Sequence, residues 1–144
     1  MSLTLSKLPF FIFFTAIALL FLGCGNKPVV KVYDEGEIGK IGSLAIKISP
    51  FDREIDRFFR GRYRFVESSN TVLYVVHKEN ICCNSNQNAA IKAVSGLPHN
   101  FLRMEVKRGM KTIYSYYIDL DNPVGIGDLQ RAFDRLERDL KITP

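Results

Sequence analysis

Four side chains of the kinds that bind zinc or undergo oxidation stand out in this sequence: His77, Cys82, Cys83 and His99. Together they offer the donor atoms of a four-coordinate zinc site. Their spacing matches no standard zinc site, because adjacent cysteines rarely point at one metal ion. In an oxidising compartment, Cys82 and Cys83 can instead form a strained vicinal disulfide or pair with another molecule. We therefore interpret them as a disulfide or redox pair carried on a loop, with no bound metal or cofactor.

Motifs of enzymes form a second class of candidate chemistry. The sequence contains neither the G-x-S-x-G motif of a hydrolase nor the H-E-x-x-H motif of a zinc protease. Its carboxylates fall on the outer sides of expected helices and in a glycine-rich stretch, where no apolar pocket would raise their pKa. The glycines of that stretch also lack the spacing, and the helix that follows, of a phosphate-binding loop. We predict that the protein is not an enzyme.

The N-terminus contains an unbroken run of apolar and small residues, 8–23, with a single basic residue, Lys7, before it. The run is short for a membrane-spanning helix, which needs about 20 apolar residues. It fits the apolar region of a secretory signal peptide, and this predicts export. Retention as an uncleaved helical anchor and cleavage after residues 16–18 (Ala-Ile-Ala) are the alternatives.

The apolar run ends in the residues FLGC, which place Gly23 directly before Cys24, and the polar residues GNKP follow. This ending resembles the lipobox of bacterial lipoproteins. The resemblance implies that residues 1–23 are removed as a signal peptide and that the thiol of Cys24 carries a diacylglyceryl group. Gly25, in place of aspartate, resembles the sorting pattern for the outer membrane. An incidental or buried cysteine is the alternative interpretation.

Lipidation would confine the protein to a membrane surface. Each acyl CH₂ buried in the bilayer contributes about 0.8 kcal/mol, so two or more chains hold stably. Residues 24–28 would then form a tether that reaches at most about 17 Å. Removal of residues 1–23, which include Lys7, lowers the formal net charge from +5 to +4. This charge mildly favours anionic lipid, but no run of lysines and arginines is dense enough to predict a lipid-binding patch.

The rest of the chain, residues 29–144, is long enough to bury one hydrophobic core. Alternating apolar residues predict strands at 29–33 and 44–48. Residues 72–76 are apolar on both sides, which predicts a strand in the interior of the sheet, and a further strand is expected just before a turn at 68–70. A β-hairpin is expected to turn near Gly109.

Apolar residues at helical spacing predict two amphipathic helices. The first is expected to have Ser49 as its N-cap, with Asp52 completing a capping box, and to end at Gly61. Its apolar face is formed by Phe51, Ile55, Phe58 and Phe59. The second carries one apolar stripe near the C-terminus, formed by Leu129, Ala132, Phe133, Leu136 and Leu140. We expect these helices to pack on one face of an antiparallel sheet, giving a two-layer α+β sandwich as a single domain.

Three tyrosines lie in the expected hairpin together with four cations. The tyrosines are Tyr114, Tyr116 and Tyr117, and the cations are Arg103, Lys107, Arg108 and Lys111. Aromatic rings beside cations are typical of single-stranded nucleic-acid binding. An exported, lipid-anchored protein rarely meets nucleic acid, and tyrosines favour strands in any case. We therefore predict no nucleic-acid partner, and an exposed tyrosine face that could contact a protein or a glycolipid.

The order of a lipidated cysteine, a strand, a helix, antiparallel strands and a closing helix resembles the lipopolysaccharide-assembly lipoproteins of the outer membrane. The resemblance implies a non-catalytic binding or assembly accessory whose partner is another envelope protein. Two alternatives stay open. One is a lipoprotein exposed on the cell surface for interactions, and the other is a redox or metal-handling lipoprotein that uses Cys82 and Cys83.

Overall fold

The computed structural model describes residues 26–78 and 100–142. Several sequence predictions fall outside these residues: the signal peptide, the lipobox residues Gly23 and Cys24, the pair Cys82 and Cys83, and His99. The predicted tether is described only from residue 26 onward.

The described chain forms a five-stranded mixed sheet with two α-helices, and this confirms the predicted α+β class. The sheet has the strand order β1-β5-β4-β3-β2. The elements in chain order are β1 (Val29–Val32), the 3₁₀ turn η1 (Glu35–Glu37), β2 (Ala45–Ser49), α2 (Arg53–Arg62), β3 (Thr71–Lys78), β4 (Asn100–Arg108), β5 (Lys111–Leu120) and α4 (Ile126–Leu140).

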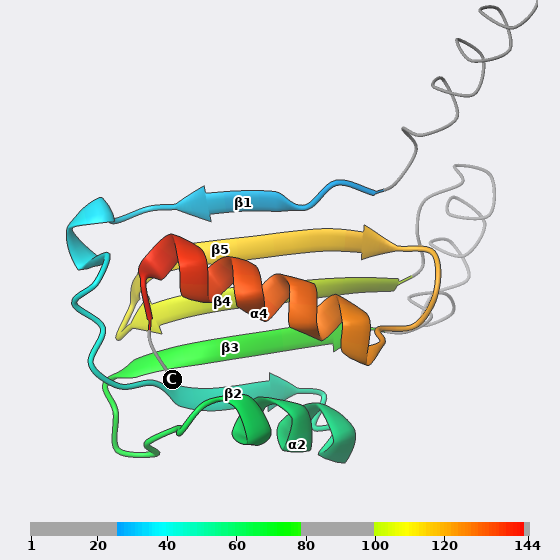
Figure 1. The fold of residues 1–144 in the computed structure, drawn as a ribbon, viewed down its shortest axis with the longest axis horizontal. Helices are drawn as coiled ribbons and strands as arrows, with labels where there is room; N and C mark the ends of the chain where they lie inside the picture. Colours follow the sequence, from blue (N-terminus) through cyan, green and yellow to red (C-terminus); the bar gives the residue numbers. More distant parts are fainter. Residues whose placement is uncertain (1–25, 79–99, 143–144) are drawn as a thin grey trace, which may run out of the picture.

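The prediction of an antiparallel sheet is wrong for one pair of strands. β2 and β3 run parallel, with Ala45 opposite Val72 and Ser49 opposite Val76, whereas the other three pairs are antiparallel. Parallel neighbours need a crossover that returns the chain to its starting end. Helix α2 provides this crossover, and the chain after α2 completes the return (Figure 1).

The returning chain also explains a strand that does not form. The segment before the turn at 68–70 was expected to be a strand, but it is irregular. A backbone hydrogen bond joins this segment to the chain just before β2, and in it the Val66 N–H donates to the Leu44 carbonyl at 2.7 Å. Instead, its aromatic rings pack against the helices, and the ring centroids of Tyr63 and Phe65 lie 5.0 Å apart. Packing on the core therefore replaces strand pairing here.

Helix α2 begins later than the sequence indicates. Asp52, and not Ser49, is the N-cap, and its carboxylate accepts hydrogen bonds from the backbone N–H groups of Glu54 at 2.8 Å and Ile55 at 3.0 Å. A carboxylate at this position satisfies helix N–H groups that have no partner within the helix. The helix also continues through Gly61 to Arg62, so the predicted end was one residue early.

One hydrophobic cluster joins both helices to one side of the sheet. All five residues of the predicted C-terminal stripe are buried, as are Ile55 and Phe59 of α2. Phe59 and Phe133 meet edge to face, with ring centroids 5.4 Å apart, so the two helices contact each other through the middle of this cluster. In Figure 1 both helices lie on the viewer's side of the strands.

The predicted hairpin is confirmed. β4 and β5 pair from Asn100 opposite Leu120 to Arg108 opposite Lys111, so Gly109 and Met110 make the turn. Gly109 has φ of +59°, a conformation that glycine adopts without steric cost. This turn and the start of β1 lie at opposite ends of the sheet, because β1 runs antiparallel to β5 (Figure 1).

Candidate functional site

The sheet has a second side, away from α2 and α4, on which cationic side chains gather. Strand residues alternate between the two sides, and those opposite the core carry the charge. We call this surface the basic face. Its cations are Lys31, Lys47, Lys78, Arg103 and Lys107, and its carboxylates are Glu105 and Asp119.

Aromatic rings lie among these cations. The Lys47 and Lys107 ammonium groups lie 5.7 Å and 5.6 Å from the centre of the Tyr74 ring. Lys107 also forms an ion pair with Glu105 at 2.9 Å. The Lys31 ammonium lies 4.6 Å from the centre of the Tyr33 ring, just beyond the end of β1. Cations placed over rings keep part of their surface free for an external anion.

A second aromatic group lies near the end of β5. Phe101 and Tyr117 stack with centroids 5.7 Å apart, and the Tyr117 hydroxyl donates to the Asp119 carboxylate at 2.6 Å. Burial, reinforced by this hydrogen bond, raises the pKa of Tyr117 to about 12. The phenol therefore stays protonated at neutral pH, and it serves as a hydrogen-bonding and stacking group without acting as a base.

The predicted tyrosine face is wrong for two of its three members. Tyr114 and Tyr116 lie on the helix side and are buried, so only Tyr117 belongs to the basic face. Adjacent strand residues point to opposite sides of a sheet, so Tyr116 and Tyr117 cannot share a face. A bulge decides which side each takes, because Val106 pairs with Tyr114 but Lys107 pairs with Thr112, and Ile113 has no partner on β4. An extra residue shifts the alternation of side chains by one position. The Tyr114 hydroxyl reaches the Asp139 carboxylate of α4 at 3.4 Å.

His77 occupies the end of β3, and its surroundings argue against a ligand role. The side chain is 7% exposed, and its Nε2 lies 2.9 Å from the Pro50 carbonyl, to which it donates. A hollow of about 530 Å³ opens beside it, lined in part by Phe51 and Lys78. Phe51 is 71% exposed, although the sequence placed it on the apolar face of α2. The structure therefore ties His77 to the backbone of the β2–α2 connection.

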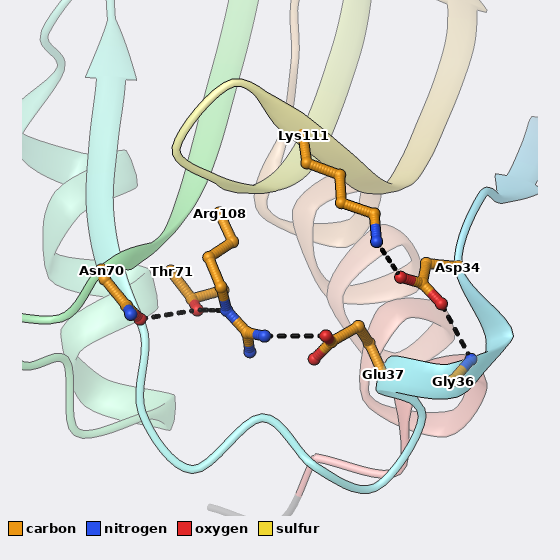
Figure 2. Close-up of polar contacts among 7 residues, drawn as sticks. All are labelled: Asp34, Gly36, Glu37, Asn70, Thr71, Arg108 and Lys111. Carbon is orange, nitrogen blue, oxygen red and sulfur yellow. Dashed lines mark hydrogen bonds and ion pairs between the residues drawn. The ribbon is translucent and has the colours of Figure 1, made fainter.

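The opposite end of the sheet holds a network of ion pairs that fixes the hairpin to the connection after β1 (Figure 2). The Arg108 guanidinium lies 2.7 Å from the Glu37 carboxylate and donates at 3.1 Å to the buried hydroxyl of Thr71. Lys111 pairs with Asp34, and this hydrogen bond lowers the pKa of that carboxyl. These charges satisfy one another, so we assign the network a structural role.

Within residues 26–78 and 100–142, no group of three or more histidine, cysteine or acidic side chains could hold a metal ion. Neither described helix is long and apolar enough to cross a membrane. The feature that sequence reasoning missed is the basic face, because its cations are scattered over four strands. The one sequence signal for the basic face is that its cations alternate with core residues along each strand.

Comparisons with protein-family models, with curated proteins and with solved structures found no match.

Proposed function

We propose that the protein is a lipid-anchored envelope protein, held at the outer membrane through Cys24, that acts as a non-catalytic binding or assembly accessory. The anchor rests on the resemblance of FLGC to a lipobox and on the apolar run before it. The partner is another envelope protein, most simply an integral protein of the same membrane.

This proposal is supported by the two segments that lie at opposite ends of the sheet. The chain that follows the proposed anchor enters the fold at Val29, and the β4–β5 turn lies at the other end (Figure 1). Met110, at the tip of that turn, is 101% exposed. A fully exposed methionine on a hairpin held by ion pairs offers an apolar contact at little cost in conformational freedom. We propose this tip as the contact with the partner.

Cys24→Ala tests the anchor. We expect the native protein to begin at Cys24 and to carry acyl chains, as intact-mass measurement would show. We expect Cys24→Ala to remain uncleaved and to lack that added mass, because the sulfur that accepts the lipid is gone. Cys82→Ala is the matched control and should be acylated like the wild type. Native protein that begins at Met1, or that salt buffer washes from the membrane, would contradict the proposal.

Met110→Asp tests the contact with the partner. After extraction in mild detergent, we expect the wild type to co-purify with an integral outer-membrane protein. A carboxylate buried at an apolar contact should lower the yield of this complex at least about tenfold. Gln130→Asp adds the same charge on the exposed side of α4 and should leave the yield unchanged. Recovery of the wild type only as free monomer would count against an accessory role.

A further inference from the structure

We infer that the basic face lies flat against the anionic surface of the bilayer that holds the anchor. This inference rests on the proposed lipidation and adds the orientation of the domain and the chemistry of its lipid contact, namely phosphate-bearing anionic headgroups.

The first support is the balance of charge on the two sides of the domain. The basic face carries five cations and two carboxylates, a net charge of three positive. Lys31, Lys47 and Arg103 form no ion pair with any described residue. An anionic membrane attracts each nearby cation strongly enough to raise binding about fivefold.

The helix side of the domain has a smaller surplus of positive charge. Helices α2 and α4 together carry seven arginines and six carboxylates, a net charge of one positive. Four of its arginines are neutralised by carboxylates: Arg60, Arg62, Arg131 and Arg135. The other three helix arginines, Arg53, Arg57 and Arg138, are exposed and form no ion pair with any described residue. A bilayer would gain less by contacting this side than the basic face, because its net charge is smaller and its paired charges are already satisfied.

The second support is the chemistry of the rings on the basic face. Tyr74, Phe101 and Tyr117 are half-buried among the cations and expose part of their surface. Tyrosine is enriched at membrane interfaces, because its ring is apolar and its hydroxyl is polar. The lysine stems can lie along these rings while the ammonium groups reach the headgroups.

The third support is the position of the tether. Val29, the first residue of β1, is 66% exposed and belongs to the same side of the sheet as the cations. Residues 24–28 reach at most about 17 Å, so the edge at β1 must stay near the headgroups. The five strands span about 19 Å from β1 to β2. A face-down domain therefore brings Lys31 and Lys47, on its two edge strands, to the bilayer together, and it leaves the hairpin tip pointing sideways along the membrane.

Lysine footprinting of the native, acylated protein in nanodiscs tests this orientation. The discs contain either phosphatidylcholine alone or equal parts of phosphatidylcholine and phosphatidylglycerol. A water-soluble amine reagent and mass spectrometry then report how fast each lysine is modified. We expect Lys31 and Lys47 to react at least about fivefold more slowly in the anionic discs. The exposed Lys40 and Lys141, which lie off this face, serve as internal controls and should react equally in both.

A charge variant shows whether the face itself causes this protection. Lys47→Gln, Arg103→Gln and Lys107→Gln together should abolish the protection of Lys31. The matched control removes three exposed helix cations through Arg53→Gln, Arg57→Gln and Arg138→Gln, and it should retain the protection. High salt should also remove the protection in the wild type, because the screening length falls to about 3 Å at 1 M.

The outcomes separate the two proposals. An intact mass without acyl chains would overturn the anchor, and the orientation with it. Acylated protein in which Lys40 and Lys141 are protected, or in which no lysine is, would overturn the orientation alone. Protection that appears only when an envelope protein is added would assign the basic face to that protein and would also overturn the lipid contact.

Discussion

Replacing Phe59 with alanine is expected to lower the free energy of unfolding by about 3–5 kcal/mol. Phe59 is fully buried, and its ring meets Phe133 of α4 at 5.4 Å and Phe65 at 6.5 Å between centroids. Truncation would remove buried apolar surface, lose these two contacts and a third edge-to-face contact with Phe58 at 5.2 Å, and leave a cavity where the helices meet. Urea denaturation followed by circular dichroism would measure the loss.

Phe51→Ala is the matched control for this prediction. It deletes the same atoms from a side chain that is 71% exposed, only eight positions earlier in the chain. We expect a change within about 0.5 kcal/mol, as for most surface substitutions. Similar losses for the two variants would mean that α2 does not bury Phe59 as the structure describes.

The second large effect is expected at Arg62, which joins the end of α2 to α4. Its guanidinium lies 2.7 Å from the Asp134 carboxylate and 3.4 Å from that of Glu137, whose side chain is 17% exposed. Arg62→Ala would leave the Glu137 carboxylate half-buried without its counter-ion. We expect a loss of about 2 kcal/mol at neutral pH in the same denaturation experiment. Arg60→Ala, which breaks exposed ion pairs with Asp56 and Glu67, should lower the free energy of unfolding much less, because water and salt screen exposed charges.

This loss should depend on pH in a direction fixed by Glu137. Burial raises the pKa of its carboxyl above the ordinary value of 4.5, while Arg62 lowers it. Below pH 4.5 this carboxyl is protonated in both the folded and the unfolded state, so its raised pKa does not lower the free energy of unfolding there. The cost of Arg62→Ala should therefore be small in acid and grow as the pH rises through the folded pKa. Adding Glu137→Gln should remove most of this pH dependence, and a cost independent of pH would contradict the account.

Much of the fold follows from local patterns in the sequence. The apolar stripe of the C-terminal helix is buried residue for residue, because a helix with one apolar side has one way to cover a core. The hairpin turns at Gly109 and Met110, close to where glycine was expected to allow it. The strand at residues 72–76 lies inside the sheet as its continuous apolar sequence predicted, because both of its edges are paired.

Other features required contacts between distant residues. The parallel pairing of β2 and β3 depends on α2 acting as a crossover. The sequence between β2 and β3 is equally consistent with a further strand that brings the chain back along the sheet. The bulge at Ile113 moved Tyr114 and Tyr116 from the expected open face into the core. Asp134 and Glu137 pair with Arg62 of the other helix, a contact across more than seventy positions.

Hydrophobic periodicity is a property of neighbouring residues, so the α+β class, the two amphipathic helices and the hairpin could be predicted from the sequence alone. The sequence also carries the motif on which the proposed anchor depends. Which side chains share a surface depends on contacts between residues that are distant in the sequence. Lys31, Lys47, Arg103 and Lys107 are separated along the chain and never form a basic run, yet strand pairing places them on one side of the sheet. Charge on a sheet accumulates across strands, and the order of those strands is set by the packing of the whole domain.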